Sequence, residues 1–151
     1  MPPSDQIILT NLAGLSNRAF TTPNIDGTIL VNLGDAFDHP DPMHYTNGAY
    51  PRPGQVFIHE LTHAWQIFHH SFTAGLICEG IVVQARYQLG ENVYAYGPPG
   101  PPYSAFNLEA QAAIVDQWFG GNGSSVPGRT PMNEQDPYFT YIANNLRLGL
   151  T

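Results

Sequence analysis

Residues 55–70, QVFIHELTHAWQIFHH, constrain the fold of this chain more than any other segment. Apolar side chains recur there at helical spacing, so we expect one helix from about residue 54 to residue 69. His59 and His63 are four residues apart and therefore lie on one face of that helix, where both rings can reach one metal ion. Glu60 lies about 60° round the helix from His63, which suits it to hold a water molecule rather than to be a ligand.

Together these three residues spell H-E-x-x-H, a motif typical of zinc hydrolases. Zinc lowers the pKa of water to about 7, and the glutamate takes a proton as the water attacks a carbonyl carbon. The surrounding segment is apolar, and two histidines without partners would be costly there. We therefore expect His59 and His63 to bind Zn²⁺ and Glu60 to act as the general base.

Spacing alone does not identify the third zinc ligand. His69 follows His63 at the distance found in H-E-x-x-H-x-x-G-x-x-H proteases, but Gln66 stands where the glycine would break the helix. In a continuous helix His69 is turned by about 120° from His63 and displaced by about 9 Å. Glu79, in CEGIVV, resembles the glutamate ligand that some gluzincins carry on the next helix. Glu109, in NLEAQAA, is the other carboxylate, and spacing does not separate it from Glu79.

The rest of the chain indicates an α+β fold, mainly helical, in one domain of residues 1–151. Turn signals and apolar runs predict the other elements: strands at 6–10 and 28–33, and helices at 75–89, 107–120 and 136–149. Asn107 and Asp136 are suitable N-caps for the last two helices.

Composition narrows the range of partners. The net charge is −7, with five arginines and no lysine, which argues against nucleic acid or an anionic membrane. The chain shows no signal-peptide pattern and no apolar run long enough to span a bilayer. We expect a secreted or delivered protein that uses a route independent of a signal peptide.

Five segments carry a resemblance to a known family. In order, GTILV, GDAFD, FIHELTHAWQ, NLEAQAAIVDQWF and DPYFTYIANNLRLG resemble the metallopeptidase domains attached to VgrG spike proteins and Rhs-type toxins of bacterial secretion systems. The resemblance covers about residues 26–149, and H-E-x-x-H-x-W-Q and E-x-Q-A are its most specific parts. It implies a gluzincin-like zinc site completed by Glu109, and a toxin or effector that meets an immunity protein or a secretion-machine component. The chain departs from the family in its proline-rich 97–102 loop and in carrying no spike or Rhs module.

Other residues are candidates for supporting roles. A ligating histidine usually donates its second ring N–H to a carboxylate or carbonyl, and Gln111 and Asp116 are the candidates on the 107–120 helix. An oxyanion also needs a hydrogen-bond donor, for which we favour Tyr141. The other candidates for that donor are Tyr138, His39 and His44.

Zincin architecture indicates how a substrate would be held. Zincins commonly hold a protein or peptide substrate as an added strand at the edge of a small sheet beside the zinc helix, and TILVNL is the expected edge strand. The resulting prediction is a zinc metalloendopeptidase. The alternatives are a zinc-stabilised binding or adaptor module without activity, which would not need Glu60, and a zinc amidase acting on cell-wall material.

Overall fold

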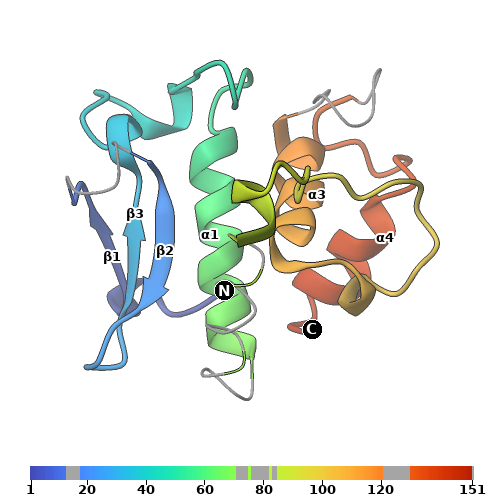
Figure 1. Ribbon diagram of the computed structural model, residues 1–151, viewed down its shortest axis with the longest axis horizontal. Helices are drawn as coiled ribbons and strands as arrows, with labels where there is room; N and C mark the ends of the chain where they lie inside the picture. The colour runs from blue at the N-terminus through green and yellow to red at the C-terminus, as the bar shows by residue number, and fades with distance from the viewer. Residues whose placement is uncertain (13–17, 71–74, 76–81, 83–84, 121–129, 151) are drawn as a thin grey trace.

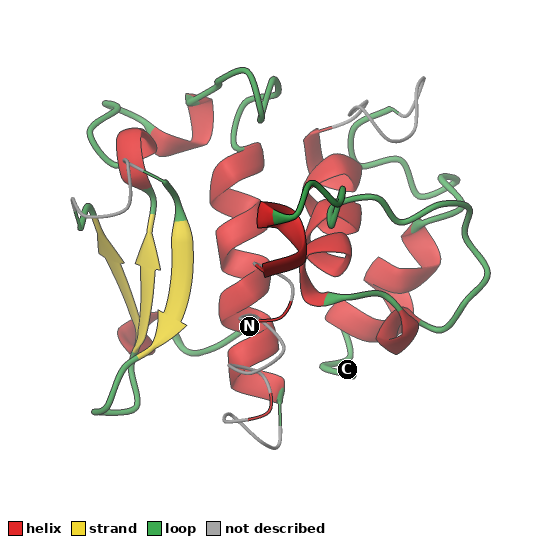
Figure 2. Ribbon diagram, in the orientation of Figure 1, coloured by secondary structure: helices red, strands yellow, loops and turns green. Residues whose placement is uncertain are grey.

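The computed structural model describes residues 1–12, 18–70, 75, 82, 85–120 and 130–150. Helix α1 (Gln55–His69) stands between a small sheet on one side and helix α3 (Leu108–Gly120) on the other (Figure 1). The short helix α4 (Phe139–Tyr141) lies on the α3 side. Helices dominate and the strands form a separate layer (Figure 2), so the predicted α+β class is confirmed.

The sheet has the strand order β1-β3-β2, with β3 (Ile29–Asn32) in the centre. Strand β1 (Ile7–Thr10) pairs parallel to β3, and β2 (Phe20–Pro23) pairs antiparallel to it. The expectation that TILVNL is an edge strand is therefore wrong. Ile29, Val31 and Leu33 of this run are buried, which is typical of a central strand bonded on both sides.

Strand β2 is the edge strand that lies beside α1. An edge strand was expected beside this helix, but it is formed by β2 rather than by TILVNL. The sequence did not predict β2, because FTTP is short and ends in proline. A proline is tolerated at a sheet edge, where its missing N–H removes no ladder hydrogen bond.

Two apolar clusters lie on either side of α1. The first lies between α1 and the sheet and contains Ile29, Val31, Leu33, Ala36, Val56 and Ala64. The second joins α1 to the C-terminal half and contains Trp65, Tyr96, Tyr103, Ala110, Ala113, Ile114, Tyr138 and Tyr141. Because both faces of α1 are covered, polar side chains on this helix are buried as well, Glu60 and Gln66 among them.

Helices α1 and α3 come together closely at Gly120. A Cβ atom at this position would lie 2.5 Å from Cγ of Gln55, so only glycine permits this approach without movement. At its other end α3 begins as predicted, because the Asn107 side chain accepts a hydrogen bond from the Ala110 N–H at 2.9 Å.

The C-terminal segment differs from the single helix expected over residues 136–149. Asp136 accepts the Tyr138 N–H at 2.9 Å, as an N-cap would, but α4 gives way to a π-helical turn at Ile142–Leu146. The wider turn places Leu146 against the second apolar cluster. Most of the predicted 75–89 helix lies outside the described residues, although positions 75, 82 and 85–88 are helical. Within the described part of the chain, no helix has the length and apolar character needed to cross a membrane.

Candidate metal centre

Three side chains from two helices meet with their ligand atoms close together. Nε2 of His59 lies 3.2 Å from Nε2 of His63. Oε2 of Glu109 lies 3.1 Å from the first of these nitrogens and 3.4 Å from the second. The three residues could hold one metal ion.

The local sequence explains how the three residues meet. His59 and His63 are one helical turn apart on α1, and their rings lie edge to face with centroids 4.8 Å apart. Glu109 is in the first turn of α3, immediately after the Asn107 cap. Gln66 of α1 donates to the Leu108 carbonyl and to Oε1 of Gln111, and these bonds join the first turn of α3 to the helix that carries the histidines. Two of the three candidates for third ligand, His69 and Glu109, lie among the described residues, and of these the structure brings Glu109 to the histidine pair.

His69 lies elsewhere, as expected of a continuous helix. Its ring contacts those of Trp65 and Phe68, and Gly149 packs against it so closely that a Cβ atom there would be 2.6 Å from Cε1 of His69. Glu79 lies outside the described residues.

Glu60 is buried, with 3% of its surface exposed, and lies next to the ligand pair. The Thr21 hydroxyl, on strand β2, lies 2.8 Å from Oε2 of Glu60 and 3.0 Å from its backbone oxygen. Burial raises the pKa of Glu60, and the nearby His63 and His59 oppose that shift. The sequence did not indicate Thr21, since the strand that carries it was not predicted.

Each histidine has a partner at its second ring nitrogen. Nδ1 of His59 lies 2.7 Å from Oδ2 of the buried Asp116, so this predicted partner is present. Nδ1 of His63 lies 2.7 Å from Oε1 of Gln66, a partner that the sequence did not indicate. The predicted candidate Gln111 bonds to Gln66 rather than to a histidine.

The charges of the group are strongly coupled. Burial alone would lower the pKa of His59, but hydrogen bonds to Asp116 and Glu109 raise it to about 10. Burial would raise the pKa of Glu109, and the two histidines hold it well below its usual range instead. In the metal-free protein the His59 imidazole therefore holds a proton while the Glu109 carboxylate is ionised, and a metal ion must displace that proton.

Two tyrosines that the sequence did not indicate flank the centre. The rings of Tyr50 and Tyr94 lie 5.5 Å and 6.0 Å from that of His59. Burial and then nearby carboxylates raise the pKa of both, that of Tyr94 to about 12, so both phenols are protonated near neutral pH. Each can therefore donate a hydrogen bond.

The tyrosines and histidines named from the sequence as oxyanion donors form hydrogen bonds to loop segments. The Tyr141 hydroxyl donates to the Pro101 carbonyl and accepts from the Gly100 N–H, both at 2.9 Å. The Tyr138 hydroxyl donates to the Gly97 carbonyl. The last two candidates, His39 and His44, both contact Asp41 in an exposed loop. The hydroxyls of Tyr138 and Tyr141 are therefore engaged with the 97–101 loop.

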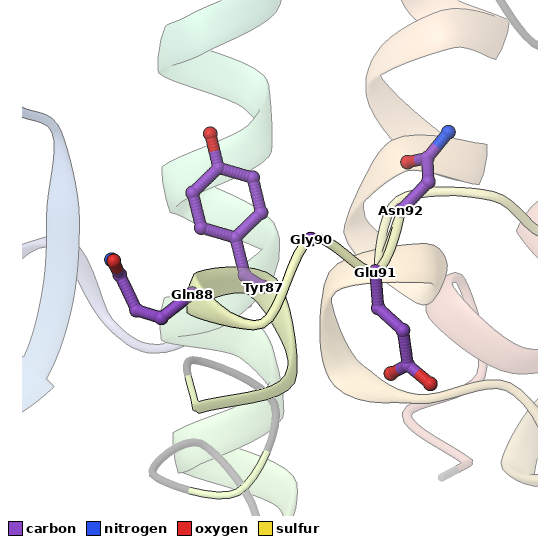
Figure 3. Close-up of a pocket in the computed structure, with 5 residues that line it drawn as sticks. All are labelled: Tyr87, Gln88, Gly90, Glu91 and Asn92. Carbon is purple, nitrogen blue, oxygen red and sulfur yellow. The ribbon is translucent and has the colours of Figure 1, made fainter.

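An open depression of about 440 Å³ lies in the segment that leads to Tyr94. It is lined by Tyr87, Gln88, Gly90, Glu91 and Asn92 (Figure 3). The Tyr87 ring contacts the Tyr94 ring at 5.9 Å, so this segment continues to the side of His59.

Comparison with known proteins gives one partial similarity. The chain is 38% identical over 65 residues to the type VI secretion system spike protein VgrG2b of Pseudomonas aeruginosa. These residues are 42% of this chain but only 6% of VgrG2b, so the chain spans a small part of the spike protein's length. No protein-family model and no solved structure matches the chain. The expected resemblance to VgrG proteins is confirmed at this level, as sequence similarity over part of the chain.

Proposed function

We propose that this protein is a zinc-dependent hydrolase, a metallopeptidase of the gluzincin type that acts as an effector of a bacterial secretion system. One observation carries the proposal. His59, His63 and Glu109 form a tripod of ligand atoms, and the buried carboxylate of Glu60 lies beside it.

The donor set and its dimensions suit zinc. Zinc–nitrogen and zinc–oxygen distances of about 2.0–2.2 Å place the ligand atoms of a tetrahedral site about 3.3–3.6 Å apart. The three separations here, 3.1, 3.2 and 3.4 Å, are close to that range before any adjustment. Three protein ligands leave the fourth position open, which is typical of catalytic rather than structural zinc sites.

The residues around the tripod have separate roles in the proposed reaction. When bound, zinc would supply a Lewis acid that activates water and polarises the substrate carbonyl. Glu60 would take the proton from the attacking water and pass it to the leaving amine, while Thr21 holds its carboxylate in place. Tyr94 and Tyr50 are the phenols beside His59 and would donate to the developing oxyanion, the role expected earlier of Tyr141.

The location of β2 suggests how a peptide would be held. This edge strand carries Thr21, whose hydroxyl reaches Glu60, so a peptide added to its outer edge would pass close to the general base. Main-chain pairing of this kind needs no particular side chain from the substrate.

The similarity to VgrG2b supports delivery by a type VI secretion system, a route that requires no signal peptide. On this proposal the partners are a protein or peptide substrate in the target cell, a component of the secretion machine and an immunity protein in the producing cell.

The test compares wild type with Glu60→Gln, which keeps the size of the side chain but removes the base. Each purified, zinc-loaded protein is incubated with bacterial periplasmic and cytoplasmic extracts, and new peptide N-termini are identified by mass spectrometry. Zinc content is measured on the same samples. Glu134→Gln, at an exposed position, is the matched control.

We expect wild type and Glu134→Gln to produce new N-termini, and Glu60→Gln to produce none while it keeps its zinc. Cleavage by Glu60→Gln at the wild-type rate would contradict the proposed role of the base. A wild-type protein that binds zinc and cleaves nothing in either extract would contradict the peptidase function. If expression of the wild type inhibits growth, inhibition that persists in Glu60→Gln would favour a binding module.

A further inference from the structure

The two histidines of the centre are held by different kinds of partner. His59 faces the carboxylate of Asp116, whereas His63 faces the side-chain amide of Gln66. An amide oxygen can only accept a hydrogen bond, so the proton of a neutral His63 ring is on Nδ1. That tautomer leaves the lone pair on Nε2, the atom that lies 3.4 Å from Oε2 of Glu109.

The orientation of the Gln66 amide is itself determined by its surroundings. Its Nε2 donates to the Leu108 carbonyl at 3.1 Å and to Oε1 of Gln111 at 2.9 Å. A backbone carbonyl has no proton to give, so the amide nitrogen must be on this side and the oxygen on the side of His63.

The same reasoning applies one step further out. Nε2 of Gln111 donates to the carbonyls of Tyr103 and Phe106, at 3.2 and 3.0 Å. This directs Oε1 of Gln111 toward Gln66. Three backbone carbonyls therefore set the orientation of the Gln66 and Gln111 amides. The Gln66 amide in turn determines which ring nitrogen of His63 carries the proton.

Burial makes this arrangement difficult to reverse. Gln66 is 2% exposed and Gln111 is 9% exposed, so water has little access to compensate a misplaced amide. Rotating either amide by 180° would place its oxygen against a carbonyl oxygen and leave buried donors without acceptors. The chain of bonds also joins α1 to residues 108 and 111, on both sides of the ligand Glu109.

We propose that Gln66 and Gln111 form an amide relay that fixes the tautomer of His63 and couples this ligand to the turn of α3 that carries Glu109. Gln66 and Gln111 are positioning residues, since they act on the metal through His63. The inference rests on the metal centre of the proposed function, but it does not require that the protein be a hydrolase.

The test measures affinity for Zn²⁺ by competition with a chelator and the absorption spectrum of the Co²⁺-loaded protein. Gln66→Met removes the acceptor with little change of volume, and Gln66→Glu keeps an acceptor for His63 but faces the Leu108 carbonyl with a second oxygen. Gln111→Met interrupts the relay without touching the histidine. The matched control is Gln117→Met, because Gln117 is also buried on α3 but bonds to the Tyr96 hydroxyl.

We expect Gln66→Met to weaken zinc binding by about 10- to 100-fold, the range typical of lost partners to metal-binding histidines. Gln111→Met should give a smaller loss, of about 3- to 10-fold, because Gln66 keeps its bond to the Leu108 carbonyl. Gln66→Glu should stay within about fivefold of wild type although it unfolds at lower urea concentration. Gln117→Met should lose stability without losing affinity.

A Gln66→Met protein that folds and binds zinc as tightly as wild type would overturn the relay. So would equal losses in Gln66→Met, Gln66→Glu and Gln117→Met, because that pattern would reflect stability alone. If Gln66→Met does not fold, Gln111→Met and Gln66→Glu decide the question by the same comparison. A wild-type protein that fails to bind zinc would instead contradict the proposed function.

Discussion

Asp116→Asn tests how the centre depends on the carboxylate behind His59. Asp116 is 3% exposed and accepts from two side chains, at 2.7 Å from Nδ1 of His59 and at 3.3 Å from Nε2 of Gln55. Asparagine has one acceptor oxygen, so it can keep the bond to His59 only by turning its NH₂ group toward the amide nitrogen of Gln55. Gln55 cannot turn in response, because its Oε1 accepts the Arg52 N–H at 2.8 Å.

The substitution therefore has two measurable effects. One buried donor loses its acceptor, which should lower the free energy of unfolding of the metal-free protein by about 1–3 kcal/mol. The bond to His59 also loses its charge, which should weaken zinc binding by about 10- to 100-fold, or about 1.4–2.7 kcal/mol.

Urea denaturation in the presence of a chelator measures the first effect, and chelator competition measures the second. Asp136→Asn is the control, because Asp136 is also buried but caps Tyr138. If Asp116→Asn binds zinc within twofold of wild type, Asp116 does not support the metal centre.

Two further predictions concern the packing of α1 and the protons of the centre. Gly149→Ala should lower the free energy of unfolding by about 1–3 kcal/mol, because Gly149 has φ +70° and a Cβ atom there would lie 2.6 Å from Cε1 of His69. Gly27→Ala, at φ +85° with no atom within 4 Å of the added Cβ, should lower it less in the same urea titration. An equal loss in the two variants would refute the steric part of the argument. Zinc affinity should fall at least about tenfold for each unit of pH below 10, because the metal must displace a proton from His59, whose pKa is about 10. An affinity independent of pH between 6 and 9 would contradict the coupling of His59 to Asp116 and Glu109. The same raised pKa means that the stabilisation of the metal-free protein by protonated His59 is complete below about pH 6.5 and is lost as the pH rises toward 10.

The sequence predicted those parts of the site that depend on a single helix. A separation of four residues places His59 and His63 together in any α-helix, and the absence of a glycine at position 66 correctly argued that His69 continues away from them. The Asn107 cap was predictable for the same reason, since capping depends on a few consecutive residues.

The remaining parts depend on contacts between distant segments. Glu109 reaches the histidines because α1 and α3 pack against each other, and no local pattern encodes that contact. The sequence named Glu109 by resemblance to a family, not by spacing. Thr21 was missed with its edge strand, and Tyr50 and Tyr94 lie in loop segments whose course is set by packing. Tyr141 was favoured for its chemistry, but its hydroxyl is bonded to the 100–101 loop.

The central claim is that His59, His63 and Glu109 hold one zinc ion, and the zinc content of Glu109→Ala measured beside that of His69→Ala tests it most directly. We expect His69→Ala, like wild type, to retain about one zinc ion per folded chain after dialysis, and Glu109→Ala to lose most of it. Retention of zinc by Glu109→Ala, or its loss from a folded His69→Ala protein, would contradict the assignment of the third ligand.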